Sequence, residues 1–355
     1  FFMTTTTCNF SCNYCIEDNI KKNYFITMDV VNAFLVYIKN YIKDKGITSL
    51  YITLYGGEPT LSWDLVVYTL SKVKNICIKN NTVLTTGIIT NGYFFRRQHV
   101  QDLMPFNFQS IQITLDGSKE FHDKRRFTKN KKPTFDVIVS NLKEIFESSS
   151  KVRISLRMNC DKENIASLKK FSSFIYSNFG NERLFIDFGY IVDNNWTCIS
   201  NNTLTKKKKE NVYSEIEFAE QLPTFYKTIS ESGYSAPDYY AIDGLCSAKT
   251  NNSFTLHPSG DVYKCVWEAG IEEYKECTIF DPDLSHTYFN KELYMDCINK
   301  KCCFLPLCQT GCPFKTKLRS KEFNGNNCLR KQYEDINKKF IIAKLGSDKD
   351  KDSYE

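Results

Sequence analysis

The first 193 residues alternate short β-rich runs with longer amphipathic segments. In residues 28–45, apolar side chains recur at three- and four-residue spacing, which places them on one face of a helix. The β-rich runs contain Ile, Val, Thr, Phe and Tyr and are bounded by Gly, Asn or Asp. The predicted strands are Phe2–Thr7, Leu50–Tyr55, Val83–Thr90, Ile111–Leu115, Val152–Met158 and Leu184–Tyr190, and the predicted helices are Met28–Lys45, Leu61–Lys79, Phe94–Met104, Phe135–Ser148 and Ile165–Asn178.

A series of βα units predicts a parallel sheet with right-handed crossovers. Six strands are fewer than the eight that close a full barrel. The sequence therefore predicts an α/β fold, a partial (β/α)6 TIM-like barrel over residues 1–193.

The pattern changes after residue 193. Residues 194–243 read as a polar, Lys-rich linker followed by a bridging helix. Residues 244–331 are rich in Cys, Gly and Pro, and they contain a short hairpin around Pro258-Ser259-Gly260. This loop-rich, cysteine-rich part is expected to be held together by metal. Residues 332–355 are predicted as a C-terminal helix and polar tail.

The composition narrows the classes of function. The chain has 355 residues and a formal net charge of +6, with its lysines partly in local runs, so no basic face for nucleic acid is expected. No apolar stretch reaches the ~18 residues of a membrane span. No secretion signal is visible, which predicts a cytoplasmic, reducing location. The 15 cysteines are then expected to be metal ligands and buried thiols rather than disulfides.

Cys8-x3-Cys12-x2-Cys15 follows the first predicted strand. Three thiolates on one loop can hold three irons of a four-iron, four-sulfur (4Fe–4S) cluster and leave the fourth iron open for a small molecule. A structural zinc site would be closed by a fourth ligand, and the nearest histidine is His99. The spacing predicts a catalytic cluster, with zinc or three unrelated thiols as the alternatives.

Further polar residues follow the later strands, at the face where barrel enzymes place their active sites. The second strand is followed by Gly56-Gly57-Glu58-Pro59, whose glycines permit a close backbone approach to a ligand. The other candidates at strand ends are Thr90, Asn91, Thr114 and Arg157.

These motifs resemble those of the radical S-adenosylmethionine (SAM) enzymes. The resemblance implies that the open iron binds the amino and carboxylate groups of SAM and that an electron cleaves SAM to methionine and a 5′-deoxyadenosyl radical. Gly56-Gly57-Glu58-Pro59 is similar to the family's motif for the methionine ammonium, and Thr90, Asn91 and Thr114 match segments that contact the cofactor. Tyr14 matches an aromatic position of the cluster loop. His122, in a His-Asp-x2-Arg stretch, is either a base or a satisfied core histidine.

The C-terminal cysteines resemble the SPASM extension, which carries two auxiliary 4Fe–4S clusters, so three clusters are expected. The resemblance implies two ligand sets. The distal set is Cys297, Cys302, Cys308 and Cys328, and the proximal set is Cys246, Cys265 and Cys312.

The chain departs from the SPASM pattern at three positions. Asn299 stands where the distal set usually has a cysteine, so Cys297 is the nearest substitute and Cys303 its rival. Tyr240 stands where the proximal set usually has a cysteine. The proximal cluster then has an open iron, or it is completed by Cys277 or Cys198. Val266 follows the hairpin cysteine, where sulfatase-activating relatives have an acidic residue.

The resemblance implies a peptide maturase of the sactipeptide or ranthipeptide type. Such an enzyme abstracts hydrogen from a ribosomally made, cysteine-containing peptide and forms a thioether cross-link. The expected partners are this precursor peptide, a flavodoxin or ferredoxin as reductant, and a leader-binding domain outside the chain. The alternatives are an anaerobic sulfatase-maturating enzyme, which forms formylglycine, and a non-catalytic iron–sulfur electron-transfer protein. The sequence names neither the residues cross-linked nor the oligomeric state.

Overall fold

The computed structural model describes residues 1–15, 17, 23–149, 151–180, 182–191, 211–234, 246–283 and 291–320, and beyond them 328, 330–331, 333–334, 336–339 and 341. Cys198 and Tyr240, two positions on which the predicted proximal set depends, lie outside these residues.

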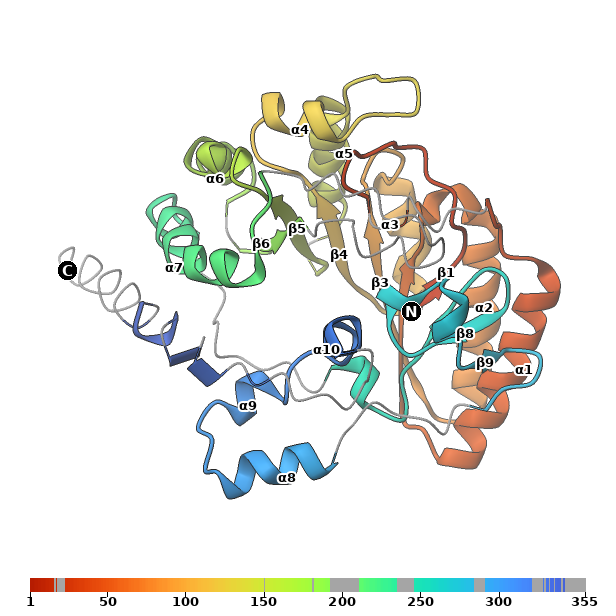
Figure 1. The fold of residues 1–355 in the computed structure, drawn as a ribbon. Helices are drawn as coiled ribbons and strands as arrows, with labels where there is room; N and C mark the ends of the chain where they lie inside the picture. The colour runs from red at the N-terminus through yellow and green to blue at the C-terminus, as the bar shows by residue number, and fades with distance from the viewer. Residues whose placement is uncertain are drawn as a thin grey trace, which may run out of the picture.

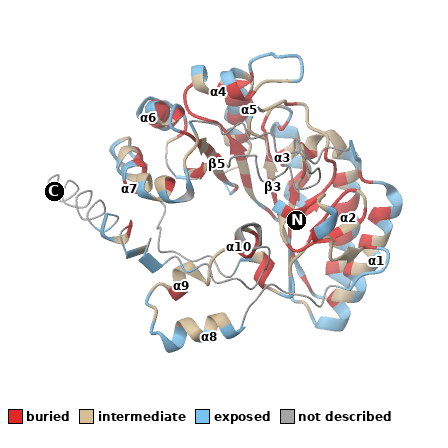
Figure 2. Ribbon diagram, viewed as in Figure 1, coloured by how far each residue is buried: buried red, intermediate tan, exposed pale blue. Residues whose placement is uncertain are grey.

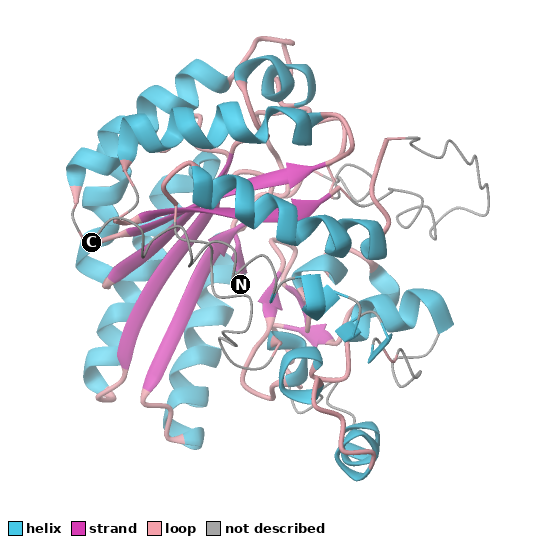
Figure 3. Ribbon diagram, turned by 90° about the vertical axis from the view of Figure 1, so that its left-hand side faces the viewer, coloured by secondary structure: helices cyan, strands magenta, loops and turns pink. Residues whose placement is uncertain are grey.

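The described strands form one sheet in the order β6-β5-β4-β3-β2-β1-β7-β8-β9. Strands β1 to β6 pair in parallel and in sequence order, which confirms the predicted partial (β/α)6 barrel. Figure 3 shows the strands side by side in one splayed sheet with helices stacked along it. The bounds are β1 Phe2–Met3, β2 Ser49–Tyr55, β3 Val83–Thr90, β4 Phe108–Thr114, β5 Arg153–Cys160 and β6 Leu184–Tyr190.

Helices follow each parallel strand and cover the sheet (Figure 1). Local signals fix the ends of α1: the Thr27 side chain accepts a hydrogen bond from the Val30 N–H, and Gly46 ends the helix in the left-handed conformation with φ 59°. The bounds are α1 Met28–Lys45, α2 Trp63–Lys79, α3 Arg97–Leu103, α4 Lys119–Arg125, α5 Phe135–Ser148, α6 Leu168–Phe179 and α7 Glu215–Glu231. Helix α4 is not predicted from the sequence, because its 7 residues are too few to show an apolar repeat.

The core lies between the sheet and the inner faces of these helices, where Figure 2 shows most of the buried residues. Val31 of α1, Leu54 of β2, Val66 of α2 and Ile154 of β5 are completely buried in it. Their alternation with exposed positions is the pattern from which the strands and helices are predicted. This core holds the strand ends, and therefore the loops that follow them, in fixed positions.

The C-terminal hairpin extends the same sheet, which the sequence does not reveal. Strand β7, Thr255–Leu256, pairs in parallel with β1, and it continues into antiparallel β8, Asp261–Tyr263, and β9, Cys277–Thr278. The cysteine-rich part is thereby joined to the barrel by backbone hydrogen bonds as well as by any metal.

The first strand is shorter than predicted. After Met3 the regular strand ends, although backbone hydrogen bonds to the end of β2 and its loop continue: the Thr5 carbonyl accepts from the Gly57 N–H at 2.9 Å, and on the other side the Thr6 N–H donates to the Tyr24 carbonyl at 3.0 Å. The β-branched residues Thr4–Thr7 favour a strand locally, but these contacts place them in the loop that leads to Cys8.

Three further helices lie together below the barrel in Figure 1: α8 Lys291–Asn299, α9 Leu305–Cys308 and α10 Pro313–Ser320. None of the helices that the structure describes is long and apolar enough to cross a membrane.

Candidate active site

A cavity of about 380 Å³ lies at the C-terminal ends of the parallel strands. It brings together most of the residues predicted to form the SAM site, namely Cys8, Cys12, Cys15, Gly56, Gly57, Thr90, Asn91, Thr114 and Arg157. Val266 and Trp267, which follow the hairpin cysteine, line the same cavity. The cavity therefore connects the barrel with the cysteine-rich part of the chain.

The two glycines allow the loop after β2 to touch the loop that leads to the cysteines. A Cβ atom on Gly56 would lie 2.3 Å from the Thr5 carbonyl oxygen, and one on Gly57 would lie 2.4 Å from the Thr7 carbonyl oxygen. Gly56 also has φ 138°, a conformation that other residues rarely adopt. The loop after β2 can lie this close to the backbone before Cys8 only because Gly56 and Gly57 lack side chains. We call this contact of Gly56 and Gly57 with Thr5–Thr7 the glycine cradle. It fits a site at which a ligand meets the backbone.

Glu58 lies outside the wall of the cavity, whereas its motif predicts contact with the methionine ammonium. It is fully buried and does not line the cavity. Its carboxylate accepts hydrogen bonds from the Thr60 hydroxyl at 2.7 Å, the Thr90 hydroxyl at 2.8 Å and the Asn91 N–H at 2.8 Å. Burial raises the pKa of Glu58, while these donors act in the opposite direction. Glu58 thus ties the loop after β2 to the end of β3. Pro59 starts the short 3-10 helix that follows and is also outside the cavity wall.

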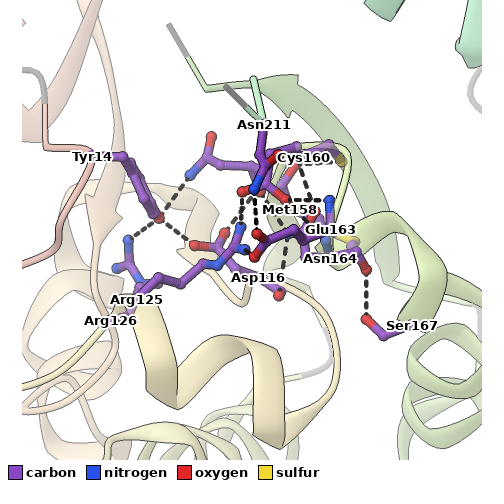
Figure 4. A network of polar contacts seen from close by, with 12 residues as sticks. Tyr14, Asp116, Arg125, Arg126, Met158, Cys160, Glu163, Asn164, Ser167 and Asn211 are labelled. Carbon is purple, nitrogen blue, oxygen red and sulfur yellow. Dashed lines mark hydrogen bonds and ion pairs between the residues drawn. The ribbon is translucent and has the colours of Figure 1, made fainter. Parts of the chain in front are cut away.

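The cluster loop is anchored by a polar network that sequence reasoning missed (Figure 4). The Tyr14 hydroxyl donates to Asp116 and accepts from Arg126 at 2.8 Å and from the Asn159 amide at 3.3 Å. Asp116 in turn accepts from the Asn159 N–H at 2.9 Å. Burial and the nearby Asp116 carboxylate raise the pKa of Tyr14 well above its usual value, so this hydroxyl stays protonated. The network holds the loop between Cys12 and Cys15 against the ends of β4 and β5.

The thiols of the loop suit a metal rather than acid–base chemistry. Burial, with a smaller effect of Glu58, raises the pKa of Cys8 to about 12. Such a thiol stays protonated at neutral pH unless a cation replaces the proton, which bound iron does. Asn91 Nδ2 lies 3.7 Å from the Cys8 sulfur and can donate to it.

Arg157, the candidate from the fifth strand, faces the cavity from β5. It forms an ion pair with Asp187 of β6 and a weak hydrogen bond with the Asn159 side chain at 3.4 Å. Its guanidinium is held at the wall by residues of two strands.

His122 is a core residue rather than a base. It is fully buried, its Nδ1 accepts from the Asp116 N–H at 3.2 Å, and its Nε2 lies 3.0 Å from the Thr134 hydroxyl. It does not line the cavity. Burial, followed by the cations Arg126 and Arg125, lowers the pKa of His122 well below its usual value.

We expect His122 to make the protein less stable in acid. The folded state keeps the imidazole neutral, whereas the unfolded chain binds a proton below a pH of about 6.5. Stability should therefore fall by up to about 1.4 kcal/mol per pH unit as the pH drops through that value. Urea unfolding at several pH values checks this: the midpoint of the wild type should fall more steeply than that of His122→Asn. Parallel curves would contradict the assignment.

The predicted distal set is assembled in the structure. Cys297, Cys302, Cys308 and Cys328 line one cavity of about 70 Å³ next to α8 and α9. Cys303 is exposed and does not line it. The lining of this cavity favours Cys297 over Cys303.

The two candidates can be separated by iron content. In anaerobically reconstituted protein, we expect Cys297→Ser to lower bound iron by up to about four per chain. Cys303→Ser, the matched control, should leave it unchanged. Equal losses, or a loss only in Cys303→Ser, would show that the ligand assignment is wrong.

The predicted proximal cysteines also lie near one another. Cys265 interacts electrostatically with Cys312 and Cys246, and burial raises its pKa. Cys277 has another environment: the charged neighbours that affect its pKa are Asp283, Glu276 and Asp281. Among the described cysteines, Cys246, Cys265 and Cys312 are therefore the ones that interact with one another, and the number of ligands in the proximal set stays a prediction. In the described part of the chain, no three Cys, His, Asp or Glu side chains are grouped closely enough to hold one metal ion.

Residues 2–175 match the family model of the Radical SAM superfamily. The chain carries a radical SAM domain. The cofactors of this family are a 4Fe–4S cluster and SAM, which confirms the class of cofactors predicted from the sequence. The number of clusters and their individual ligands stay predictions.

The likeness of this radical SAM protein to known proteins extends beyond residue 175. A cysteine-type anaerobic sulfatase-maturating enzyme of Clostridium novyi is 26% identical over 346 residues, which cover 91% of this chain and 88% of the relative. The radical SAM cyclopropyl synthase TigE of Paramaledivibacter caminithermalis is 21% identical and is covered over 63% of its length.

Solved structures show the same fold. Native anSMEcpe with bound AdoMet and Kp18Cys peptide superposes with a TM-score of 0.70 at 19% identity, over 98% of this chain and 96% of that chain. SuiB of Streptococcus suis bound to SAM gives a TM-score of 0.57 at 17% identity, over 91% and 74% of the two chains. The fold of the cysteine-rich part is therefore shared together with that of the radical SAM domain.

Proposed function

We propose that this protein is a radical SAM maturase that forms a thioether cross-link in a cysteine-containing, ribosomally made peptide. The observation that carries the proposal is the cavity shared by the Cys8 loop and the hairpin end at Val266. A substrate side chain in this cavity lies between the SAM site and the proximal cysteines.

Residues at different positions in the cavity would have different roles. Cys8, Cys12 and Cys15 would hold the cluster that binds SAM, and Gly56 and Gly57, which pack against the Thr5–Thr7 backbone, line the cavity beside it where the methionine part would bind. When bound, the cofactors supply a carbon radical that abstracts a hydrogen atom, and the auxiliary clusters supply an acceptor for one electron.

Formation of a thioether accounts for the hydrogen atom that is abstracted and for the electron that is accepted. One C–S bond forms while one C–H and one S–H bond break, so a hydrogen atom, a proton and an electron leave. A proximal set of only three cysteines leaves one coordination position for the substrate thiol, which a metal deprotonates. Cys277, whose charged neighbours are Asp283, Glu276 and Asp281 rather than Cys246 or Cys312, is consistent with this arrangement.

The residues at the hairpin end also favour the thioether over aldehyde formation. Val266 stands where sulfatase activators have an acid, and Val266 and Trp267 form an apolar wall. The nearest carboxylate in sequence, Glu268, is fully buried, accepts from the Cys265 N–H at 3.0 Å and does not line the cavity. Among the described residues that line the cavity, Glu17 is the one carboxylate, and it is engaged in a hydrogen bond with Tyr55.

Sulfatase maturation is the second candidate. It is favoured by the 26% identity to the Clostridium novyi enzyme, which extends over 91% of this chain. A peptide or protein substrate is common to both candidates. A flavodoxin or ferredoxin as reductant and a leader-binding domain on another polypeptide complete the proposal.

Mass spectrometry of a co-expressed peptide with several cysteines tests the function. We expect each cross-link to remove the mass of two hydrogens and to block one thiol from alkylation. Formylglycine would instead create an aldehyde that reacts with a hydrazide, and this product would establish the second candidate. A peptide that keeps its mass and every alkylatable thiol, under conditions in which SAM is cleaved, would contradict both.

A further inference from the structure

Lys249 is a buried lysine at the junction of the two auxiliary cysteine sets. It is 5% exposed, and its ammonium donates to the Gln309 carbonyl, to the Gly311 carbonyl at 2.6 Å and to the Thr310 hydroxyl at 3.3 Å. Three acceptors match the three donors of an ammonium group. The side chain is therefore held as a fully bonded cation.

The segment that Lys249 binds joins one set to the other. Residues 309–311 connect Cys308 of the distal set to Cys312 of the proximal set. The Cys246 N–H donates to the Gln309 side chain at 3.3 Å, and the Lys249 N–H donates to the Cys246 carbonyl at 2.8 Å. Residues 246–249 thus hold residues 309–311 through hydrogen bonds from both backbone and side-chain groups.

This connecting segment has an unusual backbone. Gln309, Thr310 and Gly311 follow one another with φ angles of 48°, 66° and 81°. The left-handed conformation is strained for each residue that is not glycine, because Cβ comes too close to the following carbonyl oxygen. Such a run persists only where its surroundings hold it, and the three contacts of Lys249 supply that restraint.

The same segment also faces a thiol. The backbone N–H groups of Thr310 and Gly311 lie beside the Cys308 thiol. The Gly311 N–H donates to the Cys308 carbonyl at 2.8 Å, and the carbonyls of Gln309 and Gly311 accept from the ammonium. Successive N–H groups of this kind form concave sites for anions and iron–sulfur clusters. Lys249 itself interacts electrostatically with Cys246, Cys308 and Cys312, which belong to both sets.

We propose that Lys249 is a positioning residue for both auxiliary clusters, holding the 309–311 segment and raising the reduction potentials of the two clusters with its charge. The inference rests on the auxiliary clusters of the proposed function, and not on the product formed. Net charge and hydrogen bonds to sulfur are among the factors that set the potential of an iron–sulfur cluster. A buried cation between the sets favours the reduced clusters, which carry one more negative charge.

The experiment is a redox titration followed by electron paramagnetic resonance, on the anaerobically reconstituted full chain without peptide. Lys249→Met removes charge and hydrogen bonds, Lys249→Gln keeps an amide donor without charge, and Lys249→Arg keeps both. The Cys8/Cys12/Cys15→Ala variant assigns the signals of the auxiliary clusters. Lys170→Met is the control for the loss of one positive charge: Lys170 lies on α6, away from α8 and α9 (Figure 1), and pairs with Glu120 at 3.2 Å.

We expect the auxiliary midpoint potentials to become more negative in Lys249→Gln and Lys249→Met and to stay unchanged in Lys249→Arg and Lys170→Met. The potential of the SAM-binding cluster should not move in any of them. Loss of auxiliary iron in Lys249→Met alone would support the role in holding the segment, and the Gln and Arg variants would then report the charge. Wild-type potentials in Lys249→Gln at full iron content would overturn the inference. Absence of iron–sulfur clusters from the wild-type C-terminal sets would instead refute the proposed function.

Discussion

Replacing Cys8, Cys12 and Cys15 together by alanine is expected to abolish SAM cleavage completely. The triple variant should also lose about four iron and four sulfide per chain out of roughly twelve of each. The reason is geometric, because these three sulfurs line the cavity beside the glycine cradle, whereas the other two sets lie in the C-terminal part. Iron analysis and the yield of 5′-deoxyadenosine from reconstituted protein measure the two effects.

Two other outcomes of this experiment are informative. Zinc at one or two per chain with no iron, in the wild type, would contradict the cluster assignment. Persistent 5′-deoxyadenosine in the triple variant would show that SAM is cleaved elsewhere. The retained auxiliary iron, about eight per chain, is the internal control for folding.

Gly57→Ala is expected to cause the largest loss of SAM affinity from a single methyl group. The added Cβ would lie 2.4 Å from the Thr7 carbonyl oxygen and 2.7 Å from the Thr6 carbonyl oxygen, both of which are backbone atoms. The loop after β2 must therefore move away from the cluster loop. A shift of about 1 Å in a positioned site can cost roughly 100-fold in rate. Binding of SAM and the rate of its reductive cleavage should both fall by about this factor, as equilibrium binding and product assays will show.

Gly46→Ala is the matched control. Gly46 ends α1 with φ 59°, and a Cβ there has no neighbour within 4 Å. This substitution should cost about 1 kcal/mol of stability, since an L-residue is strained in that conformation, and it should leave SAM binding unchanged. Equal SAM affinities of Gly57→Ala and the wild type would mean that the cofactor does not use the cradle.

The elements predicted best are those whose ends carry their own signals. The helices Met28–Lys45 and Phe135–Ser148 and the strands Val83–Thr90 and Leu184–Tyr190 have the bounds predicted from the sequence. Their apolar periods are long enough to define a buried face without knowledge of the partner. The first strand was predicted too long, because its threonines are recruited by contacts from Tyr24 and Gly57 that are distant in sequence.

The residues of the candidate site also differ in how well the sequence predicts their positions. The spacing of the Cys8 loop and the glycines after β2 were readable because their chemistry is local. The position of Glu58 was not, since its acceptors are filled by Thr90 and Asn91 from another strand. Tyr14 was identified as an aromatic position of the cluster loop, but its hydroxyl's partners Asp116, Arg126 and Asn159 are 102 to 145 residues away in the chain and could not be predicted.

By itself, the sequence determined the order of the βα units, the three groups of cysteines and the face of the barrel at which they meet, because periodicity and short spacings act within a few residues. Only the tertiary structure decided which distant residues contact one another and line the same cavity. It joined the C-terminal hairpin to β1, turned Cys297 rather than Cys303 toward the distal set, buried His122 in the core and placed Lys249 under the segment between Cys308 and Cys312. These contacts join residues far apart in the chain, and their energies depend on burial and direction, which no local pattern records.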